Sequence, residues 1–205
     1  MPRPKSTLGA IVELVVIVGF AIGLALLIQA FVVKPYQIPT GSMIPTLKIG
    51  QRVLVQRVSY HFSDPSIGDI VVFHPPEGAD ESEMCGADRP PELEARQACP
   101  EPVDAADDTN FIKRVVATPG DELFIEDGQA IVNGEPIPDD FTRPCAGGRG
   151  CNMREPITIP PDHYFMMGDN RGASDDSRFW GPVPSDWIIG KAVATYWPLD
   201  RIGIF

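Results

Sequence analysis

The longest apolar stretch of the chain lies at its N-terminal end. Leu8 to Val33 form a run of 26 residues that contains only two strongly polar side chains, Glu13 and Gln29. About 20 apolar residues suffice for a helix to cross the hydrocarbon core of a bilayer, so the run predicts a transmembrane anchor over residues 8–33. A cleaved secretory signal has an apolar core of about 7–15 residues and a small-x-small cleavage site. The run is longer than that, and no such triplet stands at its polar end.

Beyond the anchor, apolar positions come in short runs that are rich in β-branched residues and bounded by Gly, Pro or Asp, as is typical of strands. These runs cover residues 52–58, 69–73, 111–116, 122–125, 130–132, 163–167 and 187–196. Asp127-Gly128 separates two of them and supplies the positive φ angles of a tight hairpin turn. Apart from a short helical turn expected near Pro91 to Gln97, no helical period is found. The pattern predicts an all-β domain over residues 35–205, with antiparallel sheets folded as a barrel or sandwich.

Residues 75–109 interrupt the strand pattern. They contain 11 acidic residues, six prolines and only two basic residues, Arg89 and Arg96. Such a composition buries too little apolar surface to offset the entropy of ordering the chain. We expect an acidic, proline-rich surface insertion that is poorly ordered except where cysteines staple it. A specific binding role is the alternative.

The charge balance excludes one class of function. The chain has 17 basic and 28 acidic residues, for a net charge of -11, and 14 basic and 27 acidic residues remain from Pro35 onward. A domain this acidic lacks the electrostatic surface that binds a nucleic-acid backbone.

Arg3 and Lys5 predict a short cytoplasmic N-terminus over residues 1–7, although Lys34 flanks the opposite end of the anchor.

Four cysteines follow the anchor and none lies within it. An even number on one side of a membrane suits disulfides in an oxidising compartment. Cys145 and Cys151 bracket a flexible Gly-rich stretch, and Cys85 and Cys99 bracket part of the acidic insertion, so we expect the pairs 145–151 and 85–99. A zinc site is the competing interpretation, but there is no Cys-x-x-Cys and no nearby histidine pair.

The first candidate for chemistry is the stretch from Pro35 to Leu47. Two prolines flank Thr40-Gly41-Ser42, so the backbone is stiff on both sides and free only at the glycine. This geometry can hold a serine hydroxyl out of a strand beside backbone N–H groups that stabilise an oxyanion. A turn without chemistry fits the same residues.

The second candidate is a lysine on a strand. Alternation puts Phe111, Lys113 and Val115 on one face, and an inward face would desolvate the ammonium. Desolvation lowers a lysine pKa, and a neutral lysine can act as a general base. The alternative is an edge-strand lysine that reaches water. Lys191 has nearly the same local pattern, and spacing does not distinguish the two.

The third candidate is the polar loop from Gly168 to Gly181. As a calcium-binding loop it fails, because Arg171 holds the third position and Trp180 the twelfth, where a bidentate Glu is needed. As a hydrogen-bonded loop it is plausible, with Asp176 and Arg178 available to pair. No histidine lies in a context that indicates a Ser–His–Asp triad.

Four stretches, in this order along the chain, closely resemble the conserved boxes of bacterial type I signal peptidase (leader peptidase). They are residues 38–47, 69–73, 111–121 and 168–181. The resemblance covers the anchor and nearly all of the domain except residues 75–109. Relatives with two anchors exist in the family, whereas the pattern here predicts one.

The resemblance implies a role for each matching residue. Ser42 would be the nucleophile and Lys113 its general base, a Ser–Lys dyad without histidine. The oxyanion hole would consist of the Ser42 N–H and the Thr40 hydroxyl, where many relatives carry serine. Ser174 would hydrogen-bond the lysine, and Asp176 and Arg178 would form a supporting ion pair. The residues at the small substrate pockets would be Ile38, Pro39, Met43, Leu47, Phe111 and Ile112.

The resemblance also implies a function. We expect a membrane-anchored serine endopeptidase that removes N-terminal signal peptides from exported preproteins after a small-x-small (Ala-x-Ala-like) site, through an acyl-enzyme. We expect it in the bacterial cytoplasmic membrane, single-pass with the N-terminus inside, as a monomer near the secretion channel. Its partners would be signal peptides and the lipid bilayer, with no nucleic acid, metal or cofactor. The alternative is a membrane-tethered β-domain that binds extended peptides without cleaving them.

Overall fold

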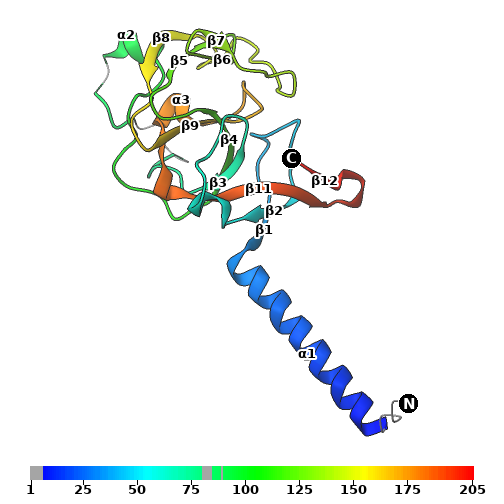
Figure 1. Ribbon diagram of the computed structural model, residues 1–205. Coiled ribbons are helices and arrows are strands. Elements are labelled where there is room, and N and C mark those ends of the chain that lie inside the picture. Colours follow the sequence, from blue (N-terminus) through cyan, green and yellow to red (C-terminus); the bar gives the residue numbers. More distant parts are fainter. Residues whose placement is uncertain (1–6, 80–84, 89) are drawn as a thin grey trace.

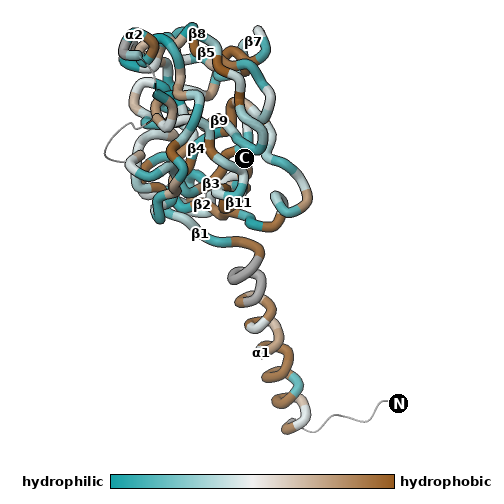
Figure 2. The backbone as a smooth tube through the Cα atoms, turned by 90° about the vertical axis from the view of Figure 1, so that its left-hand side faces the viewer, coloured by the Kyte–Doolittle hydropathy of each residue, from teal (hydrophilic) through white to brown (hydrophobic). Residues whose placement is uncertain are grey.

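The computed structural model describes residues 7–79, 85–88 and 90–205. Helix α1 (Thr7–Phe31) leaves the domain as one long rod, and Val32 alone separates it from strand β1 (Val33–Gln37) (Figure 1). In the described part of the chain, α1 is the one helix that is long and apolar enough to cross a membrane, and Figure 2 shows hydrophobic residues along most of it. Val33 was predicted within the anchor but begins β1, because its backbone pairs with Gln56. Residues 1–6, with the predicted cytoplasmic charges, lie outside the described residues.

Two antiparallel sheets build the domain (Figure 1). The larger follows the order β1-β2-β11-β3-β4-β9-β10, with β12 paired to β11, and the smaller follows β7-β6-β5-β8. The remaining strands of the larger sheet are β2 (Arg52–Gln56), β3 (Ile70–Phe73), β4 (Phe111–Ala117), β9 (His163–Met167), β10 (Val183–Pro184), β11 (Ile188–Trp197) and β12 (Gly203–Ile204). Those of the smaller sheet are β5 (Glu122–Glu126), β6 (Gln129–Val132), β7 (Glu135–Pro136) and β8 (Met153–Thr158). The predicted all-β class with one N-terminal apolar helix is confirmed.

Helices within the domain are single turns: α2 (Pro91–Glu94), α3 (Ser177–Trp180), and the 3₁₀ turns η1 (Ser59–His61), η2 (Ser185–Trp187) and η3 (Leu199–Arg201). The predicted hairpin is present, since β5 and β6 pair through Glu126 and Gln129. Its turn residues Asp127 and Gly128 have φ angles of 50° and 82°, in the left-handed region that this turn requires.

The period-two pattern of β3 and β4 sorts their side chains into two cores. Val71, Phe73 and Val115 belong to the cluster that also contains residues of β5, β6, β8 and β9, and so fills the space between the sheets. Val72 and Ile112 point to the opposite face and join a second cluster beneath the segment that links β1 to β2. Alternation holds from Phe111 to Val115, so Lys113 lies on the face of Val115. It is broken after Val115, where the register shifts and Val116 joins the same cluster.

Strand β8 was not predicted. Its sequence Met-Arg-Glu-Pro-Ile-Thr carries two charges and a proline, which together favour a loop. The strand forms because it lies at the edge of the smaller sheet, where it pairs with β5 on one side. An edge position tolerates both a proline and charged side chains.

In its described part, the insertion at residues 75–109 is closed by two contacts within itself and is tied to the smaller sheet by an ion pair. Pro76 bridges Ala106 at its base, Cys85 is bonded to Cys99, and Arg96 pairs with Glu155 of β8. Its residues 80–84 and 89, with Arg89, lie outside the described residues.

Candidate active site

A cavity of about 550 Å³ lies where four segments of the domain meet. The segment between β1 and β2 contributes Pro39 to Ser42, and the start of β4 contributes Asn110 to Lys113. The loop before α3 contributes Asn170, Ala173 and Asp175, and the insertion contributes Ala79 and Thr109. Ser42 and Lys113, 71 positions apart in the sequence, therefore line one cavity.

The backbone at Gly41 and Ser42 is held by two hydrogen bonds from Asn170, in the loop before α3. The Asn170 N–H donates to the Ser42 carbonyl oxygen (2.9 Å), and the Asn170 side chain donates to the Gly41 carbonyl oxygen (3.1 Å). Ser42 is 8% exposed, and its Oγ lies 3.3 Å from Oγ1 of Thr40. Within the described residues the Ser42 N–H has no hydrogen-bond acceptor. A hydroxyl and a backbone N–H thus stand beside Ser42 Oγ, as an oxyanion site requires.

Lys113 is 4% exposed, although lysine is almost never buried. Its Nζ lies 5.5 Å from the centroid of the Phe111 ring, on the same face of β4. Burial penalises the charged ammonium relative to the neutral amine.

Lys191 has a different environment. In the register of the sheet, Lys113 and Lys191 both pair with Val71, from opposite sides of β3. Lys191 Nζ lies 2.5 Å from Oδ1 of Asp69, whose other oxygen accepts a hydrogen bond from the Tyr60 hydroxyl (2.9 Å). Burial and the Asp69 carboxylate raise the pKa of Tyr60 above its ordinary value. The register therefore puts the two lysines in one row of the sheet, and their surroundings distinguish them. Lys191 is in an ion pair with Asp69 and does not line the cavity, whereas Lys113 does.

Gly168 lies between the Ser42 segment and Ser174. A Cβ built on Gly168 would be 2.2 Å from Ser174 Oγ and 2.5 Å from the Ser42 carbonyl oxygen. Both atoms are therefore close to one point, and only glycine leaves room for them. Ser174 is 6% exposed, and its Oγ is buried with no hydrogen-bond partner in the described part of the chain. The hydrogen bond from Ser174 to the lysine that the resemblance implied is therefore absent from the described part of the structure.

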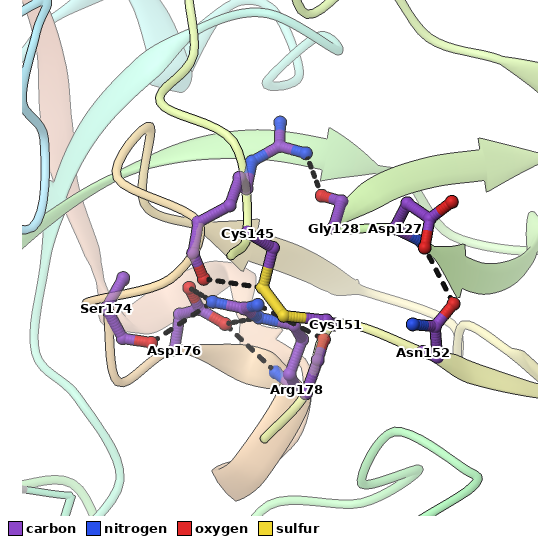
Figure 3. The surroundings of a disulfide bond; sticks show 10 residues. Asp127, Gly128, Cys145, Cys151, Asn152, Ser174, Asp176 and Arg178 are labelled. Carbon is purple, nitrogen blue, oxygen red and sulfur yellow. Dashed lines mark hydrogen bonds and ion pairs between the residues drawn. A yellow bond between two sulfur atoms is a disulfide. The ribbon is translucent and has the colours of Figure 1, made fainter. Parts of the chain in front are cut away.

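Asp176 and Arg178 form a fully buried ion pair below this loop (Figure 3). Arg178 Nε lies 2.7 Å from Oδ1 of Asp176, and its Nη2 atom donates to Oδ2 (2.9 Å) and to the Ser174 carbonyl oxygen (3.1 Å). Burial alone would raise the pKa of the Asp176 carboxyl, but the charge and hydrogen bonds of Arg178, the charge of Lys113 and the Gly168 N–H hold it below its ordinary value. Asp176 also caps the N-terminus of α3. The pair thereby fixes the loop that carries Ser174.

Another ion pair at the site was not singled out from the sequence. Arg114 donates to both oxygens of Asp169 (2.8 and 2.7 Å), and the Thr46 hydroxyl donates to Oδ2 of Asp169 (2.5 Å). These contacts join β4, the loop before α3 and the Ser42 segment. All three residues lie in the stretches that carry the family resemblance, next in sequence to Lys113, Asn170 and Leu47. That position was the one sequence signal that could have indicated a role for them at the site.

Arg171 is buried at 2% exposure beside the second disulfide. Its Nη1 donates to the Gly128 carbonyl oxygen, and burial, with the charge of Arg178, lowers its pKa despite the nearby Asp176 carboxylate. Figure 3 shows the Cys145–Cys151 disulfide together with the Asp176–Arg178 pair, and Arg178 Nη1 donates to the carbonyl oxygen of Gly150, the residue before Cys151 (3.2 Å). Both predicted cysteine pairs, 85–99 and 145–151, are at disulfide distance.

The predicted substrate-binding residues fall into two groups. Pro39, Phe111 and Ile112 line the cavity. Ile38, Met43 and Leu47 are at most 2% exposed and pack in the core cluster behind Ile112, so they support the cavity wall without lining it. In the described residues no group of three or more His, Cys, Asp or Glu side chains is placed to hold a metal ion.

Comparisons with known proteins identify the class as a peptidase. The family model described as "Signal peptidase, peptidase S26" matches residues 11–197. The chain therefore belongs to the signal peptidase family, and its curated relatives place it with the type I enzymes.

Three relatives illustrate the match. Signal peptidase I of Leptolyngbya laminosa is 35% identical over 98% of this chain and 86% of its own length. Probable signal peptidase I-1 of Synechocystis sp. is 37% identical over 89% of this chain and 81% of the relative. Thylakoidal processing peptidase 1 of Arabidopsis thaliana is 36% identical over 89% of this chain and 47% of the relative. A solved signal peptidase I from Enterococcus faecalis is 20% identical, with a TM-score of 0.39 over 63% of this chain and 97% of that one.

Proposed function

We propose that the chain is a membrane-anchored serine endopeptidase that removes signal peptides by a Ser–Lys mechanism. The observation that carries the proposal is the shared cavity in which Ser42 and the buried Lys113 meet, with the Thr40 hydroxyl 3.3 Å from Ser42 Oγ. A buried amine without its proton is a competent base for a serine hydroxyl.

In the proposed reaction, Ser42 Oγ attacks the scissile carbonyl carbon and its proton passes to Lys113. The oxyanion that forms is stabilised by the Ser42 N–H and the Thr40 hydroxyl. Lys113 then protonates the leaving amine, which departs with the mature chain, and the signal peptide stays as an ester on Ser42. Water, deprotonated by Lys113, hydrolyses the ester and restores both residues.

The substrate would bind as an added strand beside β4. Residues 111–114 of β4 pair with β3 on one side, and β9 pairs with β4 only from Arg114 onward. In the described residues, the edge of β4 at Phe111 to Lys113 is thus open toward the cavity. An extended peptide can hydrogen-bond to such an edge while alternate side chains enter pockets. A small-x-small recognition site suits this arrangement, because its two small residues lie on one face of an extended peptide.

The membrane location is supported by α1 and by exposed apolar side chains at the C-terminal end of the domain. Trp197, Leu199, Ile202 and Ile204 are between 50% and 88% exposed. They follow β11 into β12, at the end of the sheet that carries β1 and the anchor. Apolar side chains beside an anchor favour contact with a bilayer surface. With Arg3 and Lys5 inside, the catalytic domain would face the extracytoplasmic side.

The test is cleavage of a purified preprotein by detergent-solubilised or vesicle-reconstituted full-length chain. Ser42→Ala and Lys113→Ala are each expected to abolish cleavage, and the double variant should be little worse than either, because members of one catalytic unit are not additive. Lys113→Arg should also be inactive, since arginine does not release its proton. Lys191→Met is the matched control on the same sheet row and should keep most of the activity.

Equal losses for Lys113 and Lys191 would contradict the assignment of the base. A domain that only binds peptides would show no cleavage even as the wild-type chain. A penem or other acylating β-lactam separates the two cases directly, because only an activated Ser42 forms the covalent adduct.

A further inference from the structure

The acidic insertion reaches the catalytic cavity through one small residue. Ala79 lines the cavity together with Ser42, Lys113 and Phe111. It is 5% exposed and belongs to the core cluster between the sheets, against which Phe111 also packs. The remaining insertion residue at the cavity, Thr109, is exposed. A segment outside all the stretches that resemble the signal peptidase family therefore supplies part of the cavity wall.

The backbone around Ala79 is fixed by a short antiparallel ladder at the base of the insertion. The Glu77 N–H donates to the Ala105 carbonyl oxygen and the Asp107 N–H to that of Pro75, both at 2.8 Å. The Ala79 N–H closes a turn onto the carbonyl oxygen of Pro76 (3.1 Å). Ala79 therefore enters the cavity from a hydrogen-bonded base, not from an unsupported loop.

The insertion is also fixed against α3, which carries the Asp176–Arg178 pair. Cys99, bonded to Cys85, donates its N–H to the Arg178 carbonyl oxygen (3.0 Å). At the other end of α3, a Cβ on Gly181 would lie 2.7 Å from the Glu101 carbonyl carbon, so the two backbones are in direct contact. The insertion and the catalytic loop thus pack as one unit.

Alternation along β4 decides which part of a substrate faces Ala79. Phe111 and Lys113 point to the face of the cluster that contains Ala79, and Ile112 points to the opposite face. A peptide extended along this edge sends successive side chains to opposite faces. If the two small residues of a small-x-small site lie on the Ile112 face, the middle residue lies on the face of Phe111 and Ala79.

We propose that Ala79 and Phe111 form a subsite for the middle residue of the cleavage site, and that the methyl group of Ala79 sets the size of side chain it accepts. The inference rests on the proposed function, because it assumes a peptide bound along β4. In this chain the middle position is then selective for small and medium apolar side chains.

The test measures binding, so that it does not depend on cleavage. Peptides that span a cleavage site and carry Gly, Ala, Leu or Phe at the middle position are titrated against the Ser42→Ala form, and their Kd values are compared. Ala79→Leu in that background should weaken binding of the Phe peptide relative to the Gly peptide by about tenfold or more, the effect of a few methylenes in an apolar pocket. Ala79→Gly should change the ratio in the opposite direction.

Ala105→Leu is the matched control, because Ala105 is exposed on the same insertion and does not line the cavity. It should leave every ratio unchanged. Thermal unfolding of each variant checks the fold, and Ala79→Gly keeps the test decisive if Ala79→Leu is destabilised. A uniform change in Kd for all four peptides would overturn the subsite. If the wild-type chain does not cleave a preprotein but the Ala79 variants change the Kd ratios as expected, only the proposed reaction is refuted.

Discussion

Replacing Gly168 by alanine tests how closely the Ser42 segment must approach Ser174. The added Cβ would lie 2.2 Å from Ser174 Oγ and 2.5 Å from the Ser42 carbonyl oxygen. An ordinary carbon–oxygen contact is about 3.3 Å or longer, so one or both segments must move by roughly 0.8 Å or more. The Gly168 φ angle lies outside the left-handed region, so the penalty comes from this contact and not from the backbone conformation.

The displacement acts on the candidate nucleophile. A misplacement of about 1 Å can cost on the order of 10²-fold in rate, because the reacting groups leave their productive geometry. We expect Gly168→Ala to lower kcat/KM for preprotein cleavage by about 10²-fold, mainly through kcat. The assay is cleavage of a fluorogenic signal-peptide substrate at several concentrations, with thermal unfolding to verify that the domain is folded.

Gly172→Ala is the matched control on the same loop. The nearest atoms to a Cβ on Gly172 are 3.6 Å away, which is an ordinary contact, so this variant should keep wild-type activity. A folded Gly168→Ala variant with full kcat/KM would refute the reasoning, because it would mean that Ser42 and Ser174 can separate at no cost to catalysis. Equal losses in the two variants would indicate a general effect on the loop.

Two further predictions concern Thr40 and the buried ion pair. Thr40→Val should lower kcat by on the order of 10²–10³, the range for losing one oxyanion donor, whereas Thr40→Ser should stay close to wild type; a fully active valine variant would mean that Thr40 only packs. Because the folded-state pKa of Asp176 is lowered, the stability it contributes is present above the ordinary carboxyl pKa of about 3.9 and is lost as pH falls through the folded value. Urea unfolding between pH 7 and pH 2 should show this acid loss in the wild type and a flatter profile in Asp176→Asn. That variant should also be less stable at pH 7 by about 3–5 kcal/mol, because Arg178 is left buried and unpaired, and identical profiles would contradict this role.

Strands β2 to β6, β9 and β11 and the face of the lysine were predictable because they depend on local periodicity. Phe111, Lys113 and Val115 share a face in the structure as alternation requires. The distinction between Lys113 and Lys191 was not predictable from spacing. It depends on Asp69, which lies 122 positions from Lys191 and reaches it only through the pairing of β3 with β11.

The residues that form the cavity walls were also only partly predictable from the sequence. The resemblance implied pocket roles for Met43 and Leu47, and the turn between β1 and β2 directs both into the core, with no exposed surface. Ala79 carried no sequence signal at all, because a lone alanine in an acidic, proline-rich segment has no periodicity to place it. Its position follows from the ladder between residues 75–77 and 105–107, which closes over a long stretch of chain.

The joint between α1 and the domain has a mechanical consequence. Val32 alone separates the helix from β1, the Arg57 N–H donates to its carbonyl oxygen (2.9 Å), and β1 is then paired with β2 along its whole length. No flexible linker therefore separates α1 from β1, so a change in the tilt of α1 relative to the membrane is passed on to the domain. A helix longer than the local hydrocarbon thickness tilts to match it. In the proposed membrane setting, that tilt would rotate the domain with the helix and change the height of Ser42 above the lipid, so bilayer thickness itself would tune the rate of processing.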